Sequence, residues 1–287
     1  MNHQPGPHPR QQPGARELRR RAADARRWAT ALTRIAPNEV DVRGYPVDEL
    51  MGRLTFGEAV YLLLRGELPS AAIGKLFAAV LVSSLDHGVT PPSTLAARNV
   101  ATTGAPLRDA VAAGIMGFGA YHGGDIESSM RFLQEGLALR RNGATYEEAA
   151  RAILAGRGEA TANPPGFGHR VHTRDPRAAR LMQLAHELDL DGEHCHLLRV
   201  VERLINQAPD RAQYPLPLNV DGAIAAVCGD LGFEPEIANG LFIIARVPGL
   251  LAHAAEERAR QPRMRQIDPT DHVYDGPERR RLPETRR

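Results

Sequence analysis

The sequence has 287 residues, 43% of them hydrophobic and 24% charged, which is typical of a folded globular protein with one large domain or two unequal ones. Its 36 basic residues nearly balance its 34 acidic ones, and a net charge of +2 excludes the strong positive field of a nucleic-acid-binding protein. No uninterrupted apolar run reaches membrane-spanning length, and the N-terminus has no apolar signal-peptide core. We therefore expect a cytoplasmic protein with no nucleic-acid or membrane partner.

The two cysteines, Cys195 and Cys228, are too few for a disulfide framework and lack the spacing of a zinc site. We expect both to pack as small apolar groups. His186, His194 and His196 have no carboxylates at a ligand spacing, so we interpret them as surface or capping residues. The sequence predicts no metal site.

Residues 1–15 are rich in Pro, Gln, Gly and His and are predicted to be disordered. From Arg16 to Leu32 apolar residues recur at helical spacing, and several arginines lie mostly off that stripe. A basic arm for a polyanion is one interpretation. We favour the other, in which the arginines form the solvated face of a packed helix.

The rest of the chain shows helical patterns almost throughout, which predicts an all-α fold. Residues 43–50 indicate a turn and a short helix. The next helix is capped by Thr55, with Glu58 at the capping-box position, and stops at Gly66. Further helices are predicted at 71–86, 95–103, 107–121, 126–137, 145–155, 178–188 and 197–208, around Ile224, Val227 and Leu231, and at 241–253.

Residues 163–177 form an irregular loop, because two prolines and two glycines within six residues cannot propagate a helix. Asp175 and Pro176 then read as the N-cap and first position of the next helix. Helical side chains lean toward the N-terminus, so the Arg177 guanidinium is expected to point back over the loop that carries His169. A histidine beside a cationic fork suits a small carboxylate substrate, although a tight connection with solvated cations is the plainer alternative.

Two other polar residues are placed where helices begin. His122 lies at a helix-to-helix junction, near amide groups that stabilise a developing negative oxygen, although such a histidine is more often structural. Asp221 falls in or just before the first turn of a helix, where an aspartate is usually only a cap. Residue types alone leave both alternatives open.

Five segments of the sequence resemble signature motifs of the citrate synthase superfamily. Gly166 to Arg170, followed by Asp175-Pro176-Arg177, resembles its central signature. The other segments are Arg43 to Leu50 with Thr55 to Pro69, the His122-Gly123-Gly124 element with Glu127, Asn219-Val220-Asp221, and Leu241 to His253. Asp125 and Ile126 depart from the family's "HGGANE" wording, and Gly222 replaces the Phe of "NVDF", which we expect to widen the local space.

The resemblance implies an all-α, citrate synthase-like fold built as a homodimer. The larger helical domain would comprise residues 16–124 and 233–287, and a smaller one would comprise 125–232, with the active site in the cleft between them. The resemblance also assigns residues to roles. The catalytic set is His122, His169 and Asp221, with Asp221 as the base.

The remaining assignments concern ligand binding. Substrate contacts are assigned to His87, Arg177 and Arg246. Gln261 stands where the family has an arginine that reaches the partner subunit's site, and Arg263 or Arg265 could substitute for it. The CoA contacts are assigned to Pro165, Gly166, Phe167, Gly168 and Arg170.

Several segments resemble the compact citryl-CoA lyase-type branch, and the chain lacks about a domain's worth of the N-terminal sequence of longer citrate synthases. The leading hypothesis is therefore cleavage of citryl-CoA to acetyl-CoA and oxaloacetate, with a CoA thioester as substrate and no permanently bound cofactor. The alternative is a citrate or 2-methylcitrate synthase that also hydrolyses the thioester. A second alternative, motivated by Gln261, is a non-catalytic paralogue that binds CoA or a tricarboxylate.

Overall fold

The computed structural model describes residues 29–119, 122–123, 125–157, 163–169, 172–207, 211, 214–266 and 268–282. The predicted disordered tail, most of the predicted basic helix and Arg170 lie outside these residues. The chain divides into two compact units, Met1–Leu68 and Pro69–Arg287. The predicted division at residues 125 and 232 stays a prediction.

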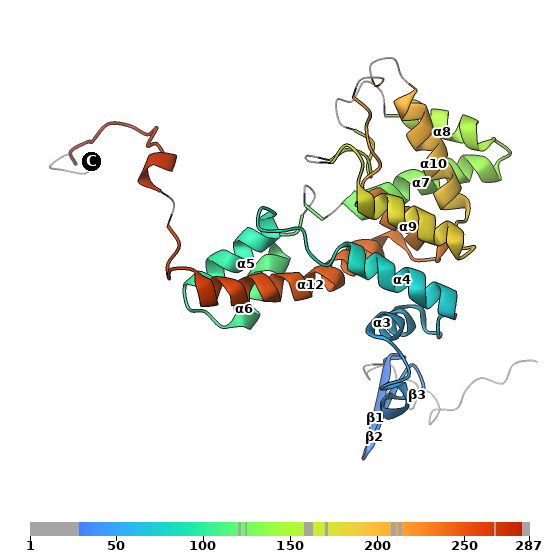
Figure 1. Cartoon of the computed structure of the whole chain (residues 1–287), viewed down its shortest axis with the longest axis horizontal. Coiled ribbons are helices and arrows are strands. Elements are labelled where there is room, and N and C mark those ends of the chain that lie inside the picture. The colour runs from blue at the N-terminus through green and yellow to red at the C-terminus, as the bar shows by residue number, and fades with distance from the viewer. Residues whose placement is uncertain are drawn as a thin grey trace, which may run out of the picture. The chain divides into compact units, whose positions relative to one another are not determined.

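The first unit holds a small antiparallel sheet in the order β1-β2-β3, followed by two helices (Figure 1). Arg43 and Gly44 both have positive φ, 51° and 86°, which is typical of a two-residue hairpin loop such as the one between β2 and β3. The bounds are β1 Thr33–Ala36, β2 Glu39–Val42, β3 Tyr45–Pro46, α2 Val47–Leu50 and α3 Phe56–Arg65. The strands are an addition that the helical reading did not anticipate, because two to four residues are too few for a clear period-2 pattern.

Helix α3 begins and ends as the sequence predicts. Thr55 accepts a hydrogen bond from the Glu58 amide, and the Glu58 side chain accepts one from the Thr55 amide, which completes the capping box. Gly66 closes the helix in the left-handed conformation, with φ 88°.

The second unit is helical throughout its longer elements, so the predicted helical class is confirmed for the part of the chain that the structure describes, with the three short strands of the first unit as an addition. Its elements are α4 Ala71–Ser83, α5 Pro92–Thr102, α6 Leu107–Met116, α7 Asp125–Arg141, α8 Tyr146–Ala155, α9 Pro176–Glu187, α10 Glu193–Asn206, α11 Val220–Asp230, α12 Pro235–Arg260 and the short 3-10 turn η2 Pro269–Asp271.

Helix α11 is the central helix of this unit. Asp221 is the only residue between Val220 and Cys228 that is not buried, and α7, α9, α10 and α12 all pack around the helix. Small side chains make this close approach possible, because six of its eleven residues are Gly, Ala or Cys. Asp221 is therefore held on a rigid, enclosed element.

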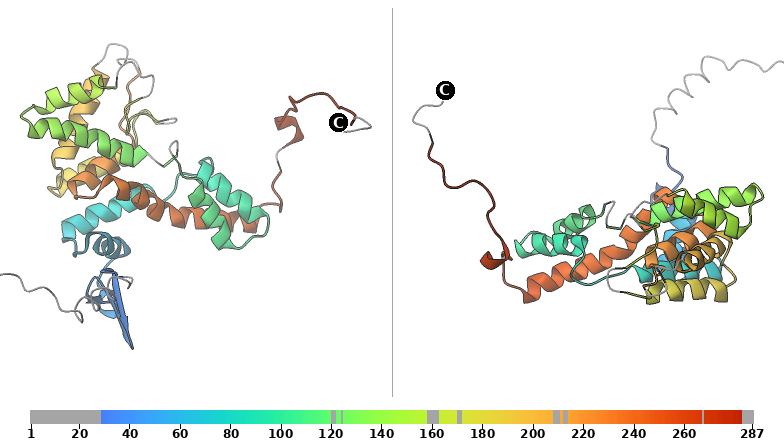
Figure 2. Two further views of the ribbon diagram at one scale, coloured as in Figure 1. Left: turned by 180° about the vertical axis from the view of Figure 1, so that it is seen from behind. Right: turned by 90° about the horizontal axis from the view of Figure 1, so that it is seen from above.

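Helix α12 is the longest element and runs beside α4, α5, α6 and α7 (Figures 1 and 2). By length and composition alone it could cross a membrane, a test that the core helix of a folded domain also passes. It contains Pro248 and continues to Arg260. Its buried face meets α5 and α6 through small side chains such as Ala101, Ala110 and Ala254.

Candidate active site

The loop 163–169 is fixed by hydrogen bonds to segments distant in the sequence. The Gly166 amide donates to Oδ2 of Asp125 (2.8 Å), and the Gly166 carbonyl accepts from the Asn219 amide (3.0 Å). The Gly168 amide donates to the Pro217 carbonyl (2.8 Å), and the Asn219 side chain donates to the Gly168 carbonyl (3.0 Å). The loop is thus bound to the start of α11.

Glycine is required at this junction. Gly166 has φ +83°, and a Cβ there would lie 2.6 Å from the Cα of Gly222. A Cβ at Gly222 would lie 2.6 Å from the Gly166 carbonyl oxygen and 2.8 Å from Cδ1 of Leu218. The expectation that Gly222 widens the local space is therefore wrong, because the backbone of the central loop fills that space.

The substitution Gly222→Ala is expected to destabilise the fold by about 1 to 3 kcal/mol, because the added methyl group meets backbone atoms that cannot rotate away. Thermal or denaturant unfolding measures the change. Gly240→Ala is the matched control, since Gly240 is also helical and nothing lies within 4 Å of its Cβ position. The control should gain up to about 1 kcal/mol. Equal stability changes in both variants would contradict the packing argument.

Asp175 joins the loop to two helices. It is the N-cap of α9, as predicted, with only 1% of its surface exposed. Its Oδ1 accepts from Nε of Arg177 (3.0 Å), and its Oδ2 accepts from Nη2 of Arg177 (2.8 Å) and from the Val220 amide (3.0 Å). Burial opposes ionisation, but the hydrogen bonds and charge of Arg177 hold the pKa of Asp175 below its ordinary value. Arg177 is oriented by this fork, which leaves Nη1 as its nitrogen without a contact to Asp175.

The turn that carries His87 is attached to α12. Nε of Arg246 donates to the Ser84 carbonyl (2.8 Å), and Nε2 of His253 pairs with Oδ1 of Asp86 (3.0 Å). Gly249 lies between them on α12, and a Cβ there would collide with the Leu85 carbonyl. These contacts fix the position of His87.

His122 is oriented by two neighbours. Its Nε2 lies 2.8 Å from Oγ of Ser93, which is fully buried, and its ring stacks on Phe118 with centroids 5.1 Å apart. Its backbone pairs with Gly119 in both directions, 2.9 and 3.0 Å. The imidazole is therefore held in one orientation just before α7.

A cavity of about 570 Å³ collects the predicted residues. All six principal candidates line it, namely His87, His122, His169, Arg177, Asp221 and Arg246. Phe167 and Gly168 line it too, whereas Pro165 and Gly166 do not, and the Gly166 amide is already used by Asp125. The assignment of CoA contacts to these loop residues stays a prediction.

His169 is the centre of a histidine cluster. Its ring stacks on His172 with centroids 4.3 Å apart, and His87 approaches edge-on at 5.5 Å. The His172 amide donates to Nδ1 of His169 (3.0 Å), so a neutral His169 ring carries its proton on Nε2. Burial lowers the pKa of His169, and the neighbouring His172 adds to this effect.

Asp221 is a carboxylate with unusual basicity. Burial raises its pKa to about 6, the negative charge of Asp125 adds to the shift, and Arg177 and Arg246 oppose it. The residue is half-buried and lines the cavity. A carboxyl group of this kind can take up and return a proton near neutral pH.

Arg246 is a buried cation with an unused donor. Only 2% of its surface is exposed, and its Nη1 has no hydrogen-bond partner among the described residues. Its guanidinium lies 4.8 Å from the centre of the Phe242 ring. Since buried donors are normally paired, this nitrogen indicates a position for an anionic ligand group.

Arg263 and Arg265, the two arginines assigned to the partner subunit's site, follow α12 and do not line this cavity. Arg265 pairs with Glu257 (2.6 Å), a carboxylate that also accepts from Arg98 (2.6 Å), and Arg263 is exposed. Neither lines the cavity of its own chain. Their assigned role toward a partner subunit stays a prediction.

Sequence reasoning missed several residues around the cavity. The sequence showed Asp125 only as a departure from the family wording, whereas its side chain binds the Gly166 amide, and the stacking of His172 and the contact of Ser93 with His122 were not foreseen. Asn219 had a local signal, since it caps α11 by accepting from the Gly222 amide. The other contacts join residues far apart in the sequence, which local patterns do not report.

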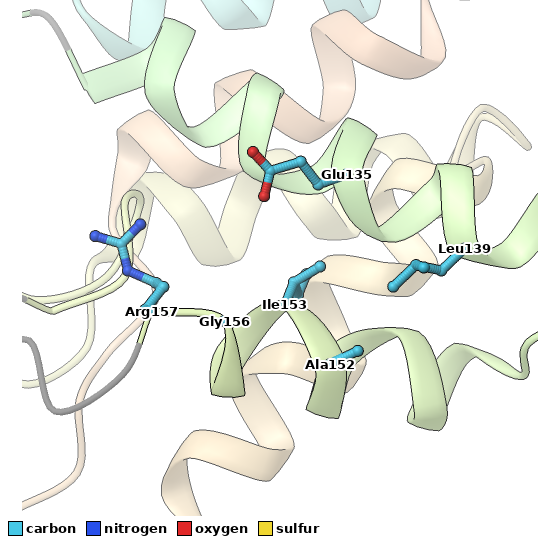
Figure 3. Close-up of a pocket in the computed structure, with 6 residues that line it drawn as sticks. All are labelled: Glu135, Leu139, Ala152, Ile153, Gly156 and Arg157. Atoms are coloured by element: carbon cyan, nitrogen blue, oxygen red, sulfur yellow. The ribbon is translucent and has the colours of Figure 1, made fainter.

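The three histidines that the sequence singled out beyond the cavity, His186, His194 and His196, have structural contacts. His194 pairs with Asp230 and His186 with Asp191, and both cysteines are buried and free, as predicted. In the part of the chain that the structure describes, no group of three or more potential metal ligands occurs. A second cavity, of about 510 Å³, lies between α7 and α8 and is lined by only two charged side chains, Glu135 and Arg157 (Figure 3).

Comparison with known proteins identifies the relatives of this chain. Residues 72–267 match the family of the citrate synthase C-terminal domain. The citrate/2-methylcitrate synthase of Bacillus subtilis is 30% identical over 212 residues, which cover 72% of this chain and 53% of the relative. The chain thus spans about half the length of the curated relatives it matches.

Two solved structures extend the comparison. The citryl-CoA lyase from Hydrogenobacter thermophilus is 41% identical with a TM-score of 0.81, over 90% of this chain and 98% of the lyase. The citrate synthase from Pyrobaculum aerophilum is 26% identical with a TM-score of 0.66, over 81% of this chain and 56% of the synthase. The predicted citrate synthase-like fold is therefore confirmed, and the chain belongs to the citrate synthase family.

Proposed function

We propose that the protein is a citryl-CoA lyase-type enzyme that cleaves citryl-CoA to acetyl-CoA and oxaloacetate. The observation that carries the proposal is the single cavity that gathers a basic carboxylate, three histidines and two arginines. The likeness to the Hydrogenobacter thermophilus lyase, which extends over 98% of that chain, supports the same choice.

The carboxylates of the substrate would bind to the two cations. Nη1 of Arg246 has no partner among the described residues, and Arg177 is held by Asp175 with Nη1 directed away from that pair. Charge-assisted hydrogen bonds from both guanidinium groups would fix the oxaloacetate part of the ligand. This orientation places the carbon–carbon bond that reacts.

Cleavage leaves an enolate on the acetyl thioester, and Asp221 in its acid form would supply the proton that turns this enolate into acetyl-CoA. In condensation the same carboxylate would remove that proton. His122, oriented by Ser93, would donate to the thioester oxygen as negative charge develops on it. The hydroxyl group of citryl-CoA would lose its proton to solvent water as its oxygen becomes the keto oxygen of oxaloacetate, and His169 would donate a hydrogen bond from Nε2 to that oxygen while it carries negative charge.

The direct test supplies citryl-CoA in one assay and acetyl-CoA with oxaloacetate in another, and follows oxaloacetate and free thiol. A lyase releases oxaloacetate from citryl-CoA without free CoA, because the thioester survives in acetyl-CoA. Free CoA together with citrate would instead indicate a synthase that hydrolyses the thioester. That alternative is favoured by the 30% identity to the Bacillus subtilis citrate/2-methylcitrate synthase.

A non-catalytic paralogue that binds CoA or a tricarboxylate is the second alternative, and it would turn over neither substrate set. Gln261, where the family has an arginine, motivates it.

We propose a cytoplasmic homodimer in which Arg263 or Arg265 approaches the partner's cavity. Sedimentation of the full chain would test the dimer.

A further inference from the structure

Asp125 brings a second carboxylate into the cavity. It is the first residue of α7 and lines the cavity beside Asp221. Its sequence position departs from the family wording, and no role follows for it from the resemblance. Its contact is specific, since Oδ2 accepts the Gly166 amide at 2.8 Å.

One residue, Gly166, links the Asp125 carboxylate to the start of the helix that carries Asp221. Gly166 donates through its amide to Asp125 and accepts through its carbonyl from Asn219, the N-cap of α11. Gly166 also packs directly against Gly222, the residue after Asp221. Asp125 and Asp221 thus flank the same glycine from two helix starts.

Other charged groups face Asp221 from the elements packed around α11. Asp175 and Arg177 come from the start of α9, and Arg246 comes from α12. From α10, Glu202 accepts from the Leu218 amide, and His194 pairs with Asp230 at the far end of α11. The histidines of the cavity are His87, His122 and His169. Asp125 is the charged group that α7 presents to this cavity.

We propose that Asp125 is a positioning residue whose negative charge makes Asp221 a stronger base and whose hydrogen bond to Gly166 holds the loop against it. This inference rests on the proposed function, in which Asp221 exchanges a proton with the thioester methyl group. Like charges in one enclosed site disfavour simultaneous ionisation, so the two carboxyls titrate as a pair. Burial raises the pKa of Asp125 as well, while the Gly166 amide and Arg157 oppose that shift.

The experiment measures exchange of the acetyl-CoA methyl protons with D₂O as a function of pH, with malate as a non-reacting dicarboxylate. Exchange needs ionised Asp221, so the wild-type rate should rise with pH through a midpoint near 6 and then level off. Asp125→Asn keeps an oxygen that accepts from Gly166 but removes the charge. Its midpoint should move to lower pH by on the order of one unit.

Glu135→Gln is the matched control, because Glu135 lies on the same helix but lines the separate α7–α8 cavity (Figure 3). Its midpoint should equal that of the wild type. Asp125→Ala removes both charge and hydrogen bond, so it should share the Asp125→Asn midpoint and have a lower plateau rate. It also serves as the second variant if Asp125→Asn folds poorly. An unchanged midpoint in the Asp125 variants overturns the inference, whereas absence of wild-type exchange overturns the proposed function instead.

Discussion

Replacing Asp221 with asparagine is expected to slow exchange of the acetyl-CoA methyl protons by about 10²- to 10⁴-fold, the usual contribution of a positioned general base. The amide has nearly the shape of the carboxyl group but cannot accept the proton. CoA and dicarboxylate affinities should change little, because the arginines and the loop stay in place. Proton NMR of acetyl-CoA in D₂O measures the rate, and calorimetry measures binding.

The same substitution should change stability in a pH-dependent way. The pKa of Asp221 is raised from 3.8 to about 6, so the fold disfavours the ionised carboxylate. The contribution of Asp221 to the free energy of unfolding is therefore largest below pH 4, and this contribution is lost as the pH rises through about 6. Asp221→Asn lacks that loss and should be more stable than the wild type above pH 6, by at most about 3 kcal/mol.

Asp109→Asn is the matched control for both measurements. Asp109 also lies in a first helical turn, that of α6, but it is exposed and outside the cavity. It should keep the wild-type exchange rate and pH dependence of stability. Retention of fast exchange in Asp221→Asn would contradict the assignment of the base.

The sequence predicted features that depend on short stretches of chain. The capping box at Thr55 and the cap at Asp175 followed by Pro176 are both present, because each is decided by residues within one helical turn. The six cavity residues were predicted differently, through a resemblance to whole motifs. The hydrophobic periodicity predicted the helices that carry these six residues, but it gave no distance between any two of their side chains.

Contacts between distant segments were not predictable in this way. Whether Gly222 leaves space depends on Gly166, 56 positions earlier by their numbering in the sequence, and the structure shows that space filled. Asp125 has an ordinary helix-starting sequence, and only the folded loop gives it the Gly166 amide. The strands β1 to β3 were missed for a different reason, since short strands carry little pattern.

Replacing Arg246 with methionine is expected to weaken oxaloacetate binding by about 10²- to 10³-fold, the loss that follows when a buried charge-assisted contact to a carboxylate is removed. The substitution should leave the stability of the ligand-free fold within about 1 kcal/mol of the wild type, although it removes the hydrogen bond to the Ser84 carbonyl. The reason is that Arg246 is buried without a carboxylate partner, and burial lowers its pKa although Asp86 and Asp221 oppose this. Calorimetric titration and thermal unfolding measure the two effects.

Arg98→Met separates this argument from a general effect of removing a largely covered arginine. Arg98 pairs with Glu257, whose side chain is fully covered, so its loss leaves a buried carboxylate with Arg265 as its remaining partner. The fold should lose about 2 kcal/mol, while oxaloacetate affinity stays at the wild-type level. Opposite outcomes in the two variants follow from one physical difference: Arg98 neutralises a charge of the protein, whereas Arg246 is left to neutralise a charge of the ligand. If Arg246→Met lowered stability as much as Arg98→Met and left affinity unchanged, Arg246 would be a structural residue.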